Sequence, residues 1–393
     1  MKQEPQDQRH RILNRSLTAF FRQAVRVAVR NPGQALTFLR TLYWLRRAAA
    51  IRSRWKREDI VAPPIIIFSI TNRCNLHCIG CYEQTFKPEG ESELDEARIR
   101  SLLTEAKELG VSFFVLAGGE PFMREHLLDL LADYPEIIFL VFTNGLLLTG
   151  EVLRRLKTQR NVVPLVSLEG DAEVTDRRRG RGVYRKVTGV MQQMRSLGIF
   201  FGTSLTLTRQ NFDQLLSREF TGHLIDAGCK FFLYLEYTPV TAGTEDWVLT
   251  GEQRARVPGL LEEYRAGYPA LFIAVPWDED AVGGCLSAAR GFVHINAAGD
   301  VEPCPFAPFS HTNVRELSLK DALQSDFFRA IREVPELSRE TGGGCILWKE
   351  RERVERILNE STGVLSETNV AVKFRSDGKK EANRLPGERR GTW

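Results

Sequence analysis

From Ala62 onward, short apolar segments alternate with helical patterns, and this alternation restricts the fold more than any other feature of the sequence. The expected strands are 65–70, 112–117, 136–142, 162–167, 200–208 and 230–237. Strictly alternating units predict a parallel sheet with right-handed crossovers, either open and doubly wound or curled into a barrel. In such folds, ligands bind at the carboxyl ends of the strands.

Three cysteines follow the first expected strand on one short loop. Cys74, Cys78 and Cys81 form a C-x3-C-x2-C arrangement. Three thiolates this close together can bind three irons of a cubane cluster and leave the fourth iron without a protein ligand. The alternatives are a zinc site completed by His77 and a redox pair of Cys78 with Cys81. We favour the open cluster, because structural zinc prefers two separated ligand pairs and a redox pair has no need of Cys74.

Later strand ends carry further short motifs. They read Gly118-Gly119-Glu120-Pro121, Thr143-Asn144-Gly145, Ser167-Leu168-Glu169-Gly170 and, from 176 to 182, D-R-R-R-G-R-G. With the cysteine loop, these motifs resemble the elements of the radical S-adenosylmethionine (radical SAM) superfamily, over about 64–240. The resemblance implies an α/β fold, a partial (β/α)6 TIM-like barrel, and an oxidoreductase. It also implies a [4Fe-4S] cluster with an open iron, which cleaves SAM reductively to a 5′-deoxyadenosyl radical that abstracts hydrogen from a substrate carbon.

The same resemblance implies the residues that contact SAM. Glu120 would receive the methionyl amino group, and Gly118 and Gly119 would let the backbone approach the ligand. Arg179 would pair with the SAM carboxylate, because a guanidinium binds carboxylates in a two-pronged geometry. Further expected contacts come from the third and fourth strand ends: Thr143, Asn144, Ser167 and Glu169.

One position departs from the family pattern. The residue before the third cysteine, often aromatic in the family, is Gly80, and Tyr82 follows the cysteine. Adenine packing is therefore arranged differently or provided by Tyr82. A non-catalytic iron–sulfur protein is the alternative to an enzyme, and the intact Gly-Gly-Glu element argues against it.

Three more cysteines lie beyond the barrel. Cys285 is followed by thirteen residues, Gly299, four residues and Cys304, and Cys345 comes later. The residues between the first two read as a β-hairpin. This pattern resembles the SPASM and twitch extensions, and implies one auxiliary [4Fe-4S] cluster on these three thiolates.

Other interpretations of this region stay open. The fourth iron would be open or bound by a non-cysteine ligand, for which His294 and His311 are candidates. The alternative is that the three cysteines are ordinary buried residues. Cys229, alone before the sixth strand, is expected to be structural.

The first 58 residues form a strongly basic arm, with fourteen Lys/Arg against three acids. Apolar residues in this arm recur at helical spacing, which predicts an amphipathic helix. The pattern is broken at Asn31-Pro32-Gly33 and then resumes. Two alternatives stay open: the arm packs on the catalytic domain, or it contacts a membrane surface. Nucleic acid is not an expected partner, because no recognition motif accompanies the charge.

These patterns divide the chain into four regions. We expect a basic helical arm (1–60), a radical SAM barrel (61–245), a cysteine-bearing hairpin and helix extension (246–358) and a polar tail (359–393). The expected location is the cytoplasm, at the inner face of the membrane if the arm binds it.

The sequence leaves the substrate and the catalytic acid or base open. Expected partners are a reductant such as ferredoxin or flavodoxin and an unidentified substrate: a peptide, a lipid or a cofactor precursor. Glu236 and the acids at 278–280 could act as a base, but no catalytic residue is assigned.

Overall fold

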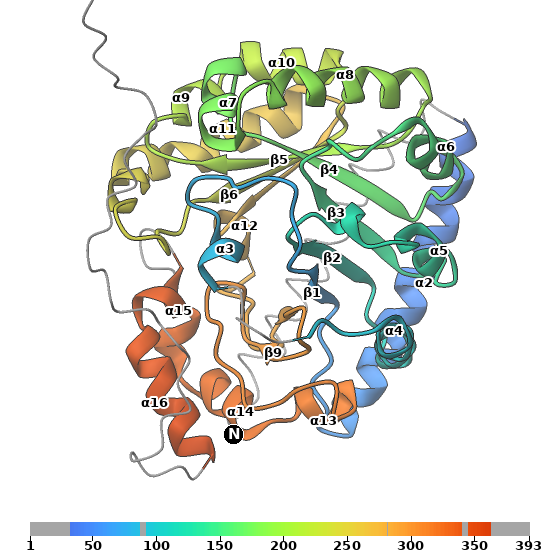
Figure 1. Cartoon of the computed structure of the whole chain (residues 1–393). Helices are drawn as coiled ribbons and strands as arrows, with labels where there is room; N and C mark the ends of the chain where they lie inside the picture. Colours follow the sequence, from blue (N-terminus) through green and yellow to red (C-terminus); the bar gives the residue numbers. More distant parts are fainter. Residues whose placement is uncertain (1–31, 87–91, 281, 340–344, 363–393) are drawn as a thin grey trace, which may run out of the picture.

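The computed structural model describes residues 32–86, 92–280, 282–339 and 345–362, with side chains from residue 39 onward in the first of these ranges. The helical stripe expected before Asn31 and most of the polar tail lie outside the described residues. The described chain forms one curved, nearly all-parallel sheet with most of its helices on the outside (Figure 1). An α/β fold of partial-barrel type, as predicted, is confirmed.

Nine strands make up the sheet, in the order β7-β6-β5-β4-β3-β2-β1-β8-β9 within the described residues. The strands are β1 (Ile65–Thr71), β2 (Phe113–Gly118), β3 (Ile138–Thr143), β4 (Val162–Leu168), β5 (Gly202–Leu207), β6 (Phe231–Glu236), β7 (Leu271–Val275), β8 (Phe292–Ile295) and β9 (Val301–Glu302). All neighbours are parallel except β8 and β9, which form an antiparallel hairpin. The predicted hairpin is therefore confirmed.

Two parallel strands extend the six that the sequence predicted. β7 pairs with β6 through Phe231 and Leu271, and β8 pairs with β1 through Ile65 and Phe292. Both strands are short apolar runs that become sheet only because the neighbouring edge is available. The domain limits proposed above remain predictions, but these strands tie the C-terminal region to the barrel sheet.

Helices connect the strands, and most of them cover the outside of the sheet (Figure 1). They are α2 (Pro32–Arg57), α3 (Tyr82–Phe86), α4 (Glu96–Leu109), α5 (Leu127–Ala132), α6 (Gly150–Thr158), α7 (Ala172–Arg179), α8 (Val183–Ser196), α9 (Phe212–Leu215), α10 (Arg218–Asp226), α11 (Gly251–Gly267), α12 (Trp277–Asp280), α13 (Leu319–Leu323), α14 (Asp326–Glu333), α15 (Ile346–Lys349) and α16 (Arg351–Thr362), with 3₁₀ turns at Pro121–Met123, Glu245–Trp247 and Pro335–Ser338. The segment between β5 and β6 forms two helices, α9 and α10, because the Ser217 hydroxyl accepts the Phe220 N–H and starts α10.

The second half of α2 packs on the barrel. The Trp55 indole N–H donates to the Glu108 carbonyl at 3.1 Å, and Arg52 donates to the Ser112 hydroxyl at 3.0 Å. The first half differs, because Leu39 is 64% and Tyr43 58% exposed. No helix of the described residues is long and apolar enough to cross a membrane.

Candidate active site

The cysteine loop that follows β1 is fastened to the end of β2. The N–H of Gly119 donates to the Thr71 carbonyl at 2.7 Å, and that of Glu120 donates to the Arg73 carbonyl at 2.8 Å. A side chain at Gly119 would overlap the Arg73 carbonyl oxygen. The space left by this bare glycine, which we expected to serve a ligand, is therefore occupied by the backbone of the cysteine loop.

Glu120 joins the ends of β2 and β3. Its carboxylate is buried and accepts hydrogen bonds from the Thr143 hydroxyl at 2.8 Å and the Asn144 N–H at 2.7 Å. Burial raises the pKa of Glu120, and these hydrogen bonds oppose the rise. Three of the predicted SAM contacts are thus brought together, beside the cysteines and in the same cavity.

The end of β3 also holds the cysteine loop directly. The Asn144 amide donates from Nδ2 to Asn75 Oδ1 at 2.7 Å, and Asn75 lies between the first two cysteines. Asn75 was not predicted as a site residue, because a loop asparagine belongs to no sequence motif. Its role follows only from the approach of the β3 turn.

Glu169 at the end of β4 binds two arginines of α7. Oε1 pairs with Arg179 Nη2 at 2.6 Å, and Oε2 pairs with Arg178 Nη1 at 2.5 Å. The carboxylate is 1% exposed, so its charge is compensated by both guanidinium groups in a buried setting. Arg179, which we expected to face SAM, is thus also paired with another predicted site residue.

Arg178 was not predicted, yet it clamps the cysteine loop. Its carbonyl accepts the Ile79 N–H at 3.0 Å, and its Nε donates to the Ile79 carbonyl at 3.2 Å. Ile79 lies between Cys78 and Cys81. Burial raises the pKa of the Cys78 thiol, and the positive charges of Arg179 and Arg178 oppose the rise. Arg178 therefore positions the loop, and the charges of both arginines favour the thiolate form of Cys78 over the thiol.

Aromatic residues border the loop on two sides. Tyr82 packs edge to face on Phe306 with ring centroids 5.6 Å apart, which directs it toward the C-terminal region. Tyr237 and Trp247 contact each other at 5.2 Å and lie against Gly80. Tyr82 was the predicted aromatic contact, whereas Tyr237 and Trp247 were not predicted, because they lie far from the cysteine loop in the sequence.

The second cysteine triad gathers at the hairpin. Cys285 precedes β8, Cys304 follows β9, and Cys345 is the N-cap of α15. The thiols of Cys304 and Cys345 share a hydrogen bond, which raises the pKa of Cys304 and lowers that of Cys345. Burial raises the pKa of Cys285 to about 12. Cys229 is buried elsewhere and donates to the Phe231 carbonyl at 3.3 Å, as expected of a structural cysteine.

His294 does not face the second triad. Its Nδ1 lies 2.6 Å from Glu302 Oε2 and its Nε2 lies 2.9 Å from the Ser69 hydroxyl. Both ring nitrogens are thus engaged in a buried network that continues from Ser69 to Glu83 at 3.2 Å. His311, the other candidate fourth ligand, packs its ring on Phe327 with centroids 6.0 Å apart.

The candidate bases also have partners. Glu236 is bound by the guanidinium of Arg254, with Nη2 at 2.9 Å. Asp278 is paired with Arg265 at 2.7 Å and accepts the Ala274 N–H. Both carboxylates are therefore structural ion pairs, and neither is assigned as a catalytic base.

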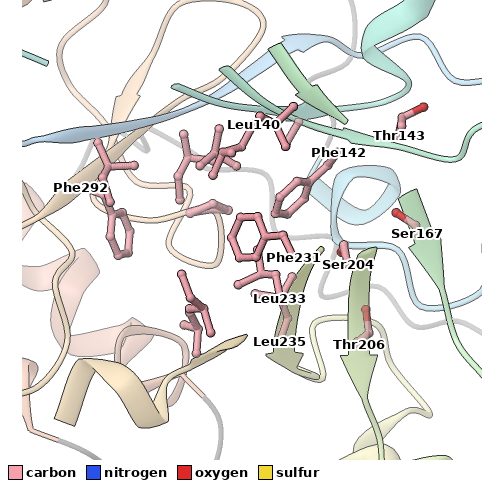
Figure 2. Close-up of a pocket in the computed structure, with 18 of the residues that line it drawn as sticks. Leu140, Phe142, Thr143, Ser167, Ser204, Thr206, Phe231, Leu233, Leu235 and Phe292 are labelled. Atoms are coloured by element: carbon pink, nitrogen blue, oxygen red, sulfur yellow. The ribbon is translucent and has the colours of Figure 1, made fainter. Parts of the chain in front are cut away.

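A single cavity of about 950 Å³ contains both triads. Its lining includes Cys74, Cys78, Cys81, Cys285, Cys304 and Cys345, all of them free thiols. Figure 2 shows part of the cavity wall, with apolar side chains from β3, β6 and β8 and hydroxyl groups from β3, β4 and β5. The cavity thus has room for a ligand between the two triads.

The donor sets fit iron–sulfur clusters. Each triad offers only soft thiolate ligands, which such clusters prefer. Within the described residues, no three His, Cys, Asp or Glu side chains converge on a single-ion site. In a cluster each thiolate binds a different iron, so its ligands stand further apart than those around one ion.

Comparisons with known proteins agree with this geometry. The family model of the radical SAM superfamily matches residues 68–217, and that of the SPASM iron-sulfur cluster-binding domain matches residues 285–345. Fe-coproporphyrin III synthase of Methanosarcina barkeri is 32% identical over 151 residues, 38% of each chain, so the match spans well under half of that relative. Mycofactocin maturase MftC of Mycobacterium tuberculosis is 28% identical over 292 residues, covering 69% of this chain and 73% of the relative.

A solved structure has a similar fold. SuiB of Streptococcus suis bound to S-adenosylmethionine superposes with a TM-score of 0.60 at 18% sequence identity, covering 72% of this chain and 70% of that one. At this identity the likeness concerns the fold alone.

Proposed function

Because the chain is a radical SAM enzyme with a C-terminal SPASM iron–sulfur domain, we propose that it abstracts hydrogen from a carbon of a substrate held in the central cavity. Its cofactors are a [4Fe-4S] cluster, SAM and an auxiliary iron–sulfur cluster. When bound and reduced by one electron, the first cluster and SAM supply a 5′-deoxyadenosyl radical and methionine, and the radical becomes 5′-deoxyadenosine on taking the hydrogen atom.

We assign the residues of the first site as follows. Cys74, Cys78 and Cys81 hold the SAM cluster and leave one iron for the ligand. Glu120 receives the methionyl ammonium, because a buried carboxylate forms a strong charge-assisted hydrogen bond. Arg179 turns Nε and Nη2 toward Glu169, which leaves its Nη1 donors for the SAM carboxylate. Gly118, Asn144 and Ser167 line the same cavity.

The second site holds the auxiliary cluster on Cys285, Cys304 and Cys345. Three thiolates leave one iron for a non-cysteine ligand or for the substrate. An open iron would bind substrate, whereas a fully ligated cluster would take up the electron left after hydrogen abstraction.

One observation carries the proposal: both cysteine triads line the same cavity of about 950 Å³. A substrate in that cavity can face both clusters at once, and the enclosing walls exclude water from a reactive radical. The relatives are named for a porphyrin and for mycofactocin, so substrate classes among them differ.

The proposed partners follow from this chemistry. A low-potential one-electron donor such as ferredoxin or flavodoxin would reduce the SAM cluster in the cytoplasm. The exposed Leu39 and Tyr43 on α2, beside Arg40, Arg46 and Arg47, would contact an anionic membrane surface.

The experiment uses the anaerobically reconstituted full chain. We expect about eight irons per chain, four per cluster, and formation of 5′-deoxyadenosine from SAM and dithionite. Replacing Cys74, Cys78 and Cys81 by alanine should remove about four irons and all 5′-deoxyadenosine, and replacing the other triad should remove the other four irons. A fully loaded sample that forms no 5′-deoxyadenosine would contradict the proposal.

A further inference from the structure

We propose that the central cavity binds the hydrocarbon chain of an anionic membrane lipid, which enters at the amino-terminal ends of the strands beside α2. The inference rests on the proposed function, because the bound chain would be the substrate.

The lumen of the barrel is not filled by side chains. In a closed TIM barrel, inward-pointing residues pack in layers and leave no pore. Here the alternate residues of β1, β2 and β3 line the cavity and stay only half-buried, while their neighbours on the outer face are buried. The inward residues of these three strands are Ile65, Ile67, Phe113, Val115, Ile138, Leu140 and Phe142. The open lumen therefore presents apolar surface that a ligand can cover.

The opposite wall is apolar as well. β6 and β7 contribute Leu233, Leu235 and Ile273, and β8 contributes Phe292. The hydroxyl groups labelled in Figure 2 come from β3, β4 and β5, toward the carboxyl ends of these strands: Thr143, Ser167, Ser204 and Thr206.

This distribution favours a hydrocarbon over a peptide. Every buried peptide N–H and carbonyl requires a hydrogen-bond partner, and leaving one unpaired is costly. On the strands of the apolar walls, the polar side chains that line the cavity are Thr143 and Glu236, which are engaged with Glu120 and Arg254, so an extended peptide would find few partners there. A hydrocarbon chain needs no such partners and gains from the apolar surface it covers.

The amino-terminal end of the lumen is basic. Lys157 and Arg160, which precede β4, are exposed and line the cavity together with Thr41 of α2. We call these three residues the basic mouth. Its cations suit an anionic headgroup, while the chain would extend through the lumen toward the cysteines.

The helix that contributes Thr41 to the basic mouth also carries an exposed apolar face. Leu39 and Tyr43 are exposed one turn apart, and Thr41, two residues from each, lies on roughly the opposite side of the helix. Arg46 and Arg47 are exposed further along. Exposed apolar side chains among arginines are typical of a helix that lies on an anionic membrane. A lipid of a membrane that contacts α2 would therefore lie close to the mouth.

The first experiment measures equilibrium binding to the reconstituted holoenzyme with cis-parinaric acid, a fluorescent long-chain fatty acid. We expect saturable binding that oleate displaces and hexanoate does not. Val115→Trp, which fills the lumen, and Leu233→Asp should each weaken binding about tenfold or more, whereas Leu317→Asp on the outer surface should not. Val115 is the decisive position, because its half-buried side chain makes a larger residue compatible with folding.

The second experiment measures co-sedimentation with vesicles of phosphatidylglycerol or phosphatidylcholine. We expect binding to the anionic vesicles alone, and its loss in the double variant Leu39→Glu/Tyr43→Glu. Absence of parinaric acid binding, binding unaffected by Val115→Trp, or displacement only by peptides would overturn the inference, as would anionic-vesicle binding unaltered in the double variant. If 5′-deoxyadenosine still forms in those samples, the proposed hydrogen abstraction stands, and only the lipid substrate or the membrane contact of α2 fails.

Discussion

Gly80 faces the hydroxyl group of Tyr237, so closely that a methyl group built on the glycine would lie 2.6 Å from Tyr237 Oη. The same methyl group would lie 3.1 Å from the Trp247 ring. The backbone of Gly80 also has a positive φ of 67°, which favours glycine. The aromatic residue often found at this position in the family therefore has no room, and Tyr237 and Trp247 occupy that space from beyond β6.

Gly80→Ala should destabilise the cysteine loop. The left-handed backbone alone costs about 1–2 kcal/mol for a residue with a side chain, and the contact with Tyr237 adds to it. We expect a lower iron content at the SAM cluster, measured by iron analysis of the variant lacking the second triad. The double variant Gly80→Ala/Tyr237→Phe should recover part of the loss.

Gly189→Ala is the matched control. Gly189 lies inside α8, and a methyl group built there meets nothing within 4 Å. This change should leave iron content unaltered and stabilise the helix by about 0.5–1 kcal/mol. Equal losses of iron in both variants would show that crowding at Gly80 is not the cause.

Arg178→Ala should impair SAM cleavage more than folding. It removes the ion pair with Glu169 and the hydrogen bond to Ile79, while Arg179 still compensates the carboxylate. A charged hydrogen bond contributes about 1.5–3 kcal/mol, so misplacing the loop should lower the rate of 5′-deoxyadenosine formation about tenfold or more. The SAM-induced change in the electron paramagnetic resonance signal of the reduced cluster should weaken as well.

The neighbouring Arg177 provides the comparison. It is 65% exposed in its side chain and pairs on the surface with Glu173. Arg177→Ala should retain the parent rate, because exposed ion pairs contribute little. A similar loss in both variants would attribute the effect to the charge of α7 and not to the clamp on Ile79.

Asn75 should tolerate aspartate better than alanine. Its Oδ1 accepts the Asn144 amide, and an aspartate keeps that acceptor. Asn75→Ala should lower the free energy of unfolding by about 0.5–1.5 kcal/mol and raise the KM for SAM, as measured by denaturant titration and by product formation. If Asn75→Asp shows the greater defect, the hydrogen bond to Asn144 does not hold the loop.

His294→Gln should leave the iron content unchanged. Both ring nitrogens are engaged with Glu302 and Ser69, so the side chain stabilises the hairpin and does not ligate the auxiliary cluster. His294→Ala should cost about 1–3 kcal/mol of stability, because it removes a partner of the buried Glu302. Loss of about four irons in the glutamine variant, with unaltered stability, would restore His294 as a ligand.

Much of the site could be anticipated because its motifs are local. The spacing of Cys74, Cys78 and Cys81 is a property of one loop. Glu120 lies just after a strand that its apolar residues predict. The hairpin around Gly299 likewise combines a turn with flanking strands. Each of these features depends on residues close in the chain.

The residues that were missed act over long distances. Arg178 and Asn75 became visible only when α7 and the β3 turn met the cysteine loop. β7 and β8 were not predicted as members of the sheet. An apolar run of four or five residues forms a strand only where the fold places the edge of another strand beside it, here β6 and β1.

The sequence by itself determined the kind of chemistry, since thiolate spacing and glycine-rich strand ends are local patterns with local consequences. Only the tertiary structure decided that both triads share one cavity, that its walls are apolar, and that Gly80 faces Tyr237. These relationships arise because a parallel sheet brings distant strand ends to the same edge. When that sheet curves, every second side chain of each strand points into the same lumen.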